Sequence, residues 1–309
     1  MSPKIQLGLV GLGKIARDQH LPAISRTPGI ELVAVASPHA RAEGVRNYAE
    51  VGEMLAAEPH LDAVVMCQPP QPRFDAARQA IAAGKHVFLE KPPGATICAV
   101  EALISLADEK GLTLFASWHS RYAAAVAPAR AWLAGRTLRR AAITWKEDVR
   151  RWHPGQTWIF DAGGFGVFDP GINALSILTE VVRDPIVLSA AELEVPSNRA
   201  APIAAKLALK TVEGAPIEAV FDFRQTGLQT WNISIETNQG ELLLSEGGDR
   251  LAIDGVAQDC GPEGEYPAMY RHFVDLVQHR RSDVDLAPLR LVADAFLSGR
   301  FRPTDPFEE

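Results

Sequence analysis

The sequence predicts an α/β protein with an N-terminal doubly wound parallel sheet, followed by an α+β domain with an open, mainly antiparallel sheet. Three observations carry this prediction: a glycine-rich turn after the first apolar run, a strand–helix rhythm over the first 120 residues, and longer alternating runs with few helices after it. We therefore expect two domains, at residues 1–122 and 123–309.

The glycine-rich turn follows the apolar run Ile5–Val10 and opens a helical segment as G-x-G-x-x-A. Gly11 allows a tight turn, Gly13 lets a pyrophosphate approach the backbone, and Ala16 lets the helix pack close to the strand. Helix-start N–H groups then face the phosphates. The turn predicts a Rossmann dinucleotide-binding domain, with a glycine turn that binds nothing as the alternative. The expected cofactor contacts here are Gly11, Gly13, Lys14 and Ile15.

The end of the second strand, Leu32–Ala36, bears on the choice of cofactor. A site selective for NAD usually places a carboxylate there to hold the ribose hydroxyls, whereas this chain has Ser37. Ser37, His39 and Arg41 can hydrogen-bond a 2′-phosphate. We expect NADP to be preferred, with NAD as the alternative cofactor. The other interpretation is that these are ordinary polar loop residues.

The rest of the first domain alternates strand and helix patterns. The further strand-like runs are Ala63–Met66, His86–Leu89 and Thr113–Ala116, and the helical patterns are Phe74–Ala83, ended by Gly84, and Ala95–Lys110. Ligands of such sheets bind beyond the carboxyl ends of the strands. The chemistry is therefore expected in the loops that follow these strands.

The second domain has long alternating runs that favour antiparallel pairing. They are Ala141–Val149, Ile186–Val195, Ala201–Thr211, Ile217–Arg224, Thr230–Thr237 and Glu241–Ser245, with helical segments at Gly171–Val182, Ala268–His279 and Leu289–Leu297. One face of this sheet is expected to be exposed, and we expect a homo-oligomer to form through it.

Composition excludes several classes of function. The 309 residues are 47% hydrophobic with a net charge of -7, which gives no electrostatic support for nucleic-acid binding. No apolar run is long enough to span a membrane, and the first apolar run lacks the basic leader and cleavage site of a signal peptide. Three cysteines without metal-ligand spacing indicate a reduced, cytoplasmic protein with no metal site.

A lysine stands directly after the strand that contains Val87, Phe88 and Leu89, in the sequence Glu90-Lys91-Pro92. An ammonium group at the carboxyl end of a strand can hydrogen-bond a substrate hydroxyl and stabilise the alkoxide as its proton leaves. The alternative is a surface lysine in a turn.

The glycine turn and the stretch A-A-G-K-H-V-F-L-E-K-P at 82–92 together resemble the Gfo/Idh/MocA family of sugar and polyol dehydrogenases, and the resemblance covers the whole chain. It implies that Lys91 works at the catalytic centre. It also implies that the loop after the strand at 63–66 lies beside the cofactor, with Arg73 where that loop often carries a histidine. The implied cofactor contacts are Cys67, Gln68, Pro69, Pro70, Glu90, Lys91 and His119.

A third family element is usually an aspartate followed four positions later by a histidine. Here Asp169 and Asn173 have that spacing, which places them on one helix face. An asparagine can orient a hydroxyl but cannot take its proton, so Lys91 or Asp169 must carry more of the proton transfer. The alternative for Asp169 is a helix N-cap with Pro170 at the first helical position.

Aromatic and polar residues suggest a sugar pocket, because sugar faces stack on aromatic rings and sugar hydroxyls need polar partners. The candidate substrate contacts are His119, Glu147, Trp152, His153, Asp169, Asn173 and Trp231. Trp145 and Trp158 fit a core equally well, and Glu147 has Arg150 or Arg151 as alternative partners.

Within the family, residues 168–176 resemble bacterial aldose 1-dehydrogenases that act on L-arabinose or D-galactose. That resemblance implies hydride transfer from C1 to the nicotinamide, giving an aldonolactone, with Lys91 and Asp169 handling the hydroxyl proton. The alternatives are a family dehydrogenase for inositol, a sugar acid or another ring hydroxyl, and a non-catalytic NAD(P)-binding sugar sensor.

Overall fold

The computed structural model describes residues 4–262 and 264–308, and the chain divides into two units. Unit 1 comprises residues up to 119 together with 264–286, and unit 2 comprises 120–262 and 287–308. The structure thus differs from the expected continuous second domain. The segment 264–286 returns to unit 1 because its helix buries aromatic side chains against the first sheet.

Unit 1 contains a six-stranded parallel sheet in the order β3-β2-β1-β4-β5-β6, as the sequence predicts. The strands are β1 (Ile5–Val10), β2 (Ile30–Ala36), β3 (Arg46–Tyr48), β4 (Ala63–Met66), β5 (His86–Glu90) and β6 (Leu114–Ser117). The order reverses between the neighbours β1 and β4. Crossover loops leave in opposite directions at that point, which opens a crevice at the carboxyl ends of the strands.

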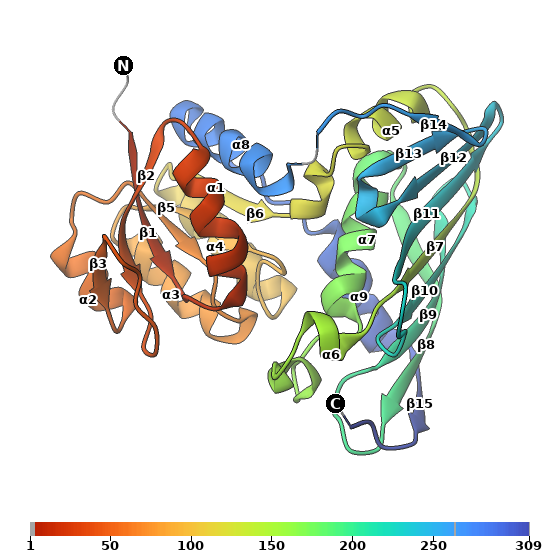
Figure 1. Cartoon of the computed structure of the whole chain (residues 1–309), viewed down its shortest axis with the longest axis horizontal. Helices are drawn as coiled ribbons and strands as arrows, with labels where there is room; N and C mark the ends of the chain where they lie inside the picture. Colours follow the sequence, from red (N-terminus) through yellow and green to blue (C-terminus); the bar gives the residue numbers. More distant parts are fainter. Residues whose placement is uncertain (1–3, 263, 309) are drawn as a thin grey trace. The chain divides into compact units, whose positions relative to one another are not determined.

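The helices of unit 1 pack in two groups, α1 with α8 and α2 with α3 and α4. They are η1 (Ala16–His20), α1 (Leu21–Arg26), α2 (Val51–Ala57), α3 (Pro70–Ala82), α4 (Ile97–Glu109) and α8 (Glu265–His279). Figure 1 shows α8, blue from its late position in the sequence, beside the red α1. Gly84 ends α3 as predicted: it has φ +74°, and the N–H of Lys85 donates to the carbonyl of Ala80.

Unit 2 contains a nine-stranded sheet in the order β14-β13-β12-β11-β7-β10-β9-β8-β15. Only the β7–β10 and β8–β15 pairs are parallel, so the expected mainly antiparallel sheet is confirmed. The strands are β7 (Leu138–Lys146), β8 (Ile186–Pro196), β9 (Ala204–Thr211), β10 (Pro216–Asp222), β11 (Thr230–Thr237), β12 (Gly240–Ser245), β13 (Arg250–Ile253), β14 (Val256–Gln258) and β15 (Arg300–Thr304).

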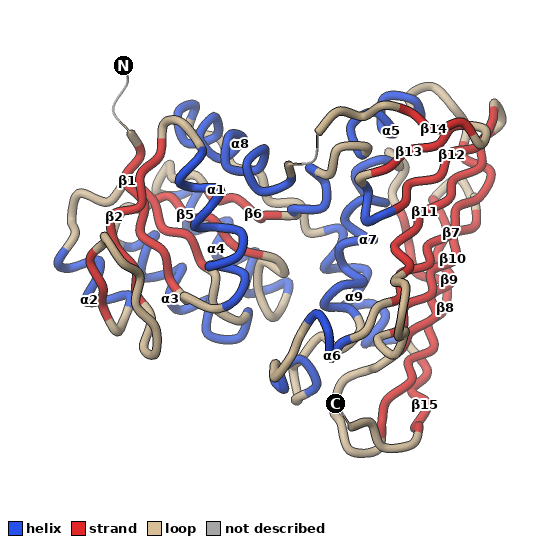
Figure 2. The backbone as a smooth tube through the Cα atoms, viewed as in Figure 1, coloured by secondary structure: helices blue, strands red, loops and turns tan. Residues whose placement is uncertain are grey.

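Helices cover one face of this sheet, and its other face is exposed (Figure 2). The covering helices are α5 (Val126–Leu133), α7 (Phe168–Val181) and α9 (Ala287–Ser298), and the short elements are η2 (His119–Tyr122), α6 (Val149–Trp152), η3 (Thr157–Phe160) and η4 (Glu246–Gly248). Strand β9 shows the two faces, because Leu207 and Leu209 are buried while Lys206, Ala208 and Lys210 are exposed. Across the described residues, no helix combines the length and apolar character needed to cross a membrane.

Candidate active site

In unit 1 the glycine turn lies where the strand order reverses. Gly11 has φ +89°, and its N–H donates to the carbonyl of Ala36 at 2.9 Å. A Cβ atom on Gly11 would lie 2.6 Å from the backbone nitrogen of Gln68, so only glycine lets the loops after β1 and β4 touch. A Cβ on Gly13 would meet no atom within 4 Å. The backbone at Gly13 is therefore open to a ligand, as a pyrophosphate site requires.

The segment after the glycines is helical from Lys14 onward, and it begins with the π-helical turn η1. Ala16 is fully buried, whereas Lys14 is exposed and pairs with Asp18 one turn later. Ile15 is half-buried at the start of this turn. The expected phosphate-binding residues thus share one exposed helix start, which favours an anion.

The end of β2 carries basic rather than acidic side chains. The guanidinium of Arg41 donates to the carbonyl oxygen of the buried Ser37 at 2.8 Å, and His39 beside it is exposed. Arg17 donates to the carbonyl of Arg41 at 3.4 Å and so adds a second guanidinium that sequence reasoning missed. Its position on the helix after the glycines was the available signal. This arrangement fits a 2′-phosphate.

Glu90 lies at the end of β5 and is only 3% exposed. One of its oxygens accepts a hydrogen bond from the Ser117 hydroxyl at 2.6 Å, and the other accepts from the Tyr266 hydroxyl at 3.2 Å. The Nε2 atom of His20 lies 3.4 Å from the Ser117-bonded oxygen. The backbone of the half-buried Lys91 therefore starts from a fixed, buried charge network.

His20 completes that network and is fully buried. Its Nδ1 atom lies 2.7 Å from the Tyr270 hydroxyl. Burial by itself would lower the pKa of His20, but the neighbouring Cys67 sulfur and the Glu90 carboxylate raise it to about 10. Burial would likewise raise the pKa of Glu90, yet hydrogen bonding and the charge of His20 lower it to about 2. The two groups are therefore an ion pair at neutral pH.

Arg73, noted in the sequence only as a departure from the family pattern, joins two cofactor loops. Its buried guanidinium donates to the carbonyl of Gln68 in the loop after β4, and to the carbonyls of Glu90 and Pro92 around Lys91. The Lys91–Pro92 peptide bond is cis. Arg73 thus holds the Cys67–Pro70 loop against the lysine loop.

The same edge of unit 1 offers polar groups to a cofactor. The side-chain carbonyl oxygen of Gln68 is buried, and it has no hydrogen-bond partner among the described residues. An amide or hydroxyl donor of a nicotinamide nucleotide would satisfy it. After β6, His119 pairs with Glu265 at 2.8 Å and stacks on Tyr266 at 5.4 Å between ring centroids. These residues fit the expected dinucleotide.

In unit 2 the candidate sugar-binding residues form one cluster around His153. Its Nε2 atom lies 3.5 Å from a Glu147 oxygen, and its Nδ1 atom lies 3.7 Å from an Asp169 oxygen. Both carboxyl residues are 5% exposed. The indole N–H of Trp231 donates to the other Glu147 oxygen at 2.9 Å. The cluster joins β7, β11 and α7.

The structure decides several alternatives left open by the sequence. Asp169 is not the N-cap of α7, because the helix starts at Phe168 with Val167 in the cap position. Asn173 follows one turn after Asp169, as expected, and is half-buried. The Arg150 partner is Asp148 rather than Glu147, at 2.7 Å.

The tryptophans divide between core and pocket. Trp145 is buried beside Trp231 across neighbouring strands, whereas Trp152 is 38% exposed and meets the Trp231 ring edge-on at 5.4 Å. Trp158 is half-buried in η3. Trp152 and Trp231 therefore supply the aromatic surface next to the His153 cluster.

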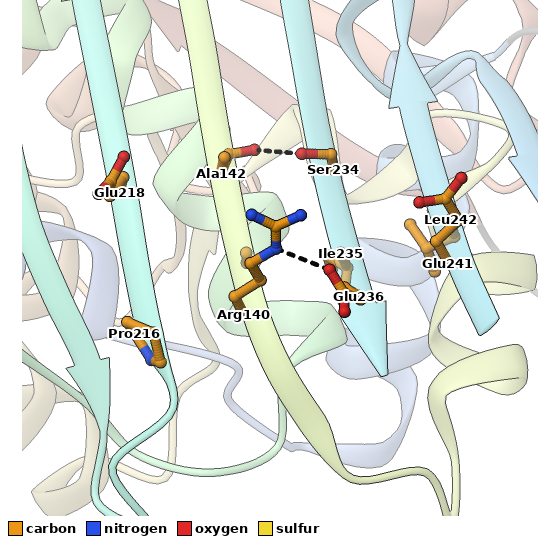
Figure 3. Close-up of a pocket in the computed structure, with 10 residues that line it drawn as sticks. Arg140, Ala142, Pro216, Glu218, Ser234, Ile235, Glu236, Glu241 and Leu242 are labelled. Atoms are coloured by element: carbon orange, nitrogen blue, oxygen red, sulfur yellow. Dashed lines mark hydrogen bonds and ion pairs between the residues drawn. The ribbon is translucent and has the colours of Figure 1, made fainter. Parts of the chain in front are cut away.

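Two other features of the described residues bear on function. No group of three or more His, Cys, Asp or Glu side chains within this part of the chain has the arrangement of a metal site. A hollow on the exposed face of the unit 2 sheet is lined by residues of β7, β10, β11 and β12 (Figure 3). It contains strand side chains such as Arg140, which donates to Glu236 at 2.7 Å, and none of the cluster residues.

Comparison with known proteins places the chain. Residues 5–117 match the GFO_IDH_MocA model, described as an oxidoreductase family with an NAD-binding Rossmann fold. Galactose 1-dehydrogenase of Pseudomonas fluorescens is 50% identical over 295 residues, which are 96% of each chain. The chain belongs to the Gfo/Idh/MocA oxidoreductase family. Unit 1 is accordingly an NAD-binding Rossmann domain, and the protein is an oxidoreductase.

Solved structures give the same assignment. The crystal structure of a D-galactose-1-dehydrogenase protein from Rhizobium etli has a TM-score of 0.96 at 54% identity and covers 100% of this chain and 99% of its own. The 3-ketoreductase KijD10 of Actinomadura kijaniata, in complex with TDP-benzene and NADP, has a TM-score of 0.85 at 20% identity, with coverage of 97% and 99%. The second likeness concerns the fold alone.

Proposed function

We propose that this oxidoreductase is an aldose 1-dehydrogenase that oxidises D-galactose, and also L-arabinose, at C1 to the aldonolactone, with NADP as the preferred cofactor. The observation that carries the proposal is the polar and aromatic cluster of Glu147, His153, Asp169 and Trp231 in unit 2. Such a mixture of carboxylates, imidazole and indole suits a sugar ring. Two galactose 1-dehydrogenases with at least half of the sequence in common support the choice of galactose.

The extension to L-arabinose rests on stereochemistry. L-Arabinopyranose has the same configuration as D-galactopyranose at each shared ring centre and lacks the hydroxymethyl group. A pocket that admits the larger sugar discriminates against the smaller one only weakly, by about 10- to 200-fold. Both sugars are therefore substrates in this proposal.

The cofactor, when bound, accepts a hydride from C1. In our proposal the residues around Gly11 and Gly13 hold its pyrophosphate, and Ser37, His39 and Arg41 hold a 2′-phosphate. The guanidinium groups of Arg41 and Arg17 support NADP, because planar donors bind phosphate strongly.

The chain's own chemistry concerns the proton of the C1 hydroxyl. Lys91 donates a hydrogen bond to this oxygen and stabilises its developing negative charge. Asp169 accepts the proton, because a carboxylate is a base whereas the neighbouring Asn173 amide is not. The positions of Glu147 and Trp231 serve to orient the ring.

The test is the initial rate of NADP and NAD reduction with D-galactose, L-arabinose, D-glucose and myo-inositol, together with identification of the product. We expect NADPH formation with the first two sugars and a lactone that hydrolyses to the aldonic acid. Lys91→Ala should lower kcat by at least about 100-fold while the protein still binds NADPH. Oxidation of inositol alone would replace our substrate, and tight cofactor binding without turnover would favour a sensor.

We further propose that copies of this chain assemble through the exposed face of the unit 2 sheet. Small side chains such as Ala142 and Ser234 make the centre of this face flat enough for a second sheet, as Figure 3 shows, and ion pairs such as Arg140–Glu236 border it. The cysteines Cys67, Cys98 and Cys260 are free thiols, which supports the cytoplasmic location expected from the sequence.

A further inference from the structure

The family pattern places a histidine at position 173, and this chain has Asn173 there. The structure brings another imidazole to the same aspartate: the Nδ1 atom of His153, from the loop after α6, lies 3.7 Å from Asp169. The two residues come from separate segments, so their sequence spacing gave no sign of the contact.

The surroundings of His153 are unusual for a structural histidine. Its two ring nitrogens face two different carboxylates, Asp169 on one side and Glu147 on the other, at 3.7 and 3.5 Å. Those two carboxylates are the charged groups that face the ring, from α7 and from the end of β7, and the Phe223 ring packs on it at 5.6 Å. The His153 side chain keeps 17% of its surface exposed, so a proton can still reach it.

We infer that His153 is a positioning residue for Asp169 and a relay for the proton that Asp169 receives. This inference rests on the proposed function. During the reaction the O1–H bond of the sugar breaks and its proton moves to Asp169, while the C1–H electron pair leaves as hydride to NADP and the C1=O bond forms. The proton then passes to Nδ1 of neutral His153, and Nε2 releases its own proton toward Glu147 and solvent.

The present separations are longer than hydrogen bonds, which is common for catalytic groups before substrate binds. Trp231 fixes Glu147 through its indole N–H at 2.9 Å, so the carboxylate that receives the proton stays in place. A small rotation of the imidazole can therefore shorten each contact in turn. An asparagine at 173 is tolerated because the relay no longer needs an imidazole on that helix.

The test uses His153→Gln, which keeps a polar group of similar length but cannot pass a proton. We expect kcat to fall by about 10- to 100-fold with KM changed by less than threefold. The pH at which kcat/KM is half-maximal should move toward acid by more than one unit, because an uncharged imidazole is no longer required. In His153→Ala, added imidazole should restore part of kcat. Arg150→Gln, three residues away on the same segment, is the matched control and should leave all three parameters unchanged.

Two further measurements keep this inference separate from the proposed function. NADPH binding to unit 1 should be unchanged in His153→Gln, which establishes that the variant is folded. The NMR titration of the His153 ring should move in Glu147→Gln and in Asp169→Asn, with or without any sugar. If the wild type oxidises a different sugar, the same series is run on that sugar. A wild-type pH profile and kcat in His153→Gln, or a ring titration unaffected by both neighbours, would overturn the relay.

Discussion

Replacing His20 by glutamine should destabilise unit 1 more than any surface change, because it removes the cation that faces the buried Glu90 carboxylate. Breaking a buried ion pair from one side typically costs about 3–5 kcal/mol, since the remaining charge keeps its desolvation penalty. In a unit of this size each kcal/mol lowers Tm by about 3 °C, so His20→Gln should lower it by roughly 9–15 °C.

The pH dependence has a defined sign. The pKa of His20 rises from 6.5 to about 10, so its contribution is complete below pH 6.5 and is lost as pH rises toward 10. The pKa of Glu90 falls from 4.5 to about 2, so its contribution is complete above pH 4.5 and is lost as pH falls toward 2. The pair therefore stabilises unit 1 most between pH 4.5 and 6.5.

Scanning calorimetry of the cofactor-free protein at pH 6 and pH 9.5 provides the assay, with the unit 1 transition identified by its upward shift on adding NADPH. Wild type should lose Tm between these pH values, and His20→Gln should lose much less. The double variant His20→Gln/Glu90→Gln should recover part of the stability. His279→Gln, an exposed pair with Asp275 on α8, is the control. A drop below 3 °C with an unchanged pH slope would show that the buried pair does not stabilise the unit.

Two further predictions concern the glycine turn and the exposed sheet. Gly11→Ala should weaken NADPH binding at least tenfold in a fluorescence titration, because the new Cβ meets the Gln68 backbone at φ +89°, whereas Gly13→Ala should leave the cofactor-free Tm unchanged. Equal cofactor affinity in Gly11→Ala and wild type would contradict this account. Ala142→Arg, beside Ser234 on the exposed face, should dissociate the oligomer in sedimentation velocity, and an unchanged sedimentation coefficient would place the interface elsewhere.

Local sequence signals predicted the parts of the fold that depend on neighbouring residues. The glycine turn and Gly84 both stand where the chain needs a positive φ, and their positions alone fixed the start and end of helices. The short strands β3, β13, β14 and β15 escaped, because three to five residues at a sheet edge carry too little alternation to be recognised.

The site was predicted only as far as single motifs reach. Lys91 and Asp169 stood out because of their positions after a strand and in a family element. His20 did not, since it looks like an ordinary helix residue until Tyr270, 250 positions later, is placed beside it. The Arg73 bridge and the His153–Asp169 contact were missed for the same reason: both depend on which loops the fold brings together.

The return of α8 to unit 1 has a consequence for how the molecule is made. Tyr266 and Tyr270, which complete the shell around Glu90 and His20, follow nearly the whole of unit 2 in the chain. On the ribosome, the first sheet therefore emerges with its charge pair uncovered and waits for more than a hundred residues before its last aromatic partners arrive. Unit 2 is in effect an insertion, and a mutation that delays its folding would prolong the exposure of the cofactor domain's interior.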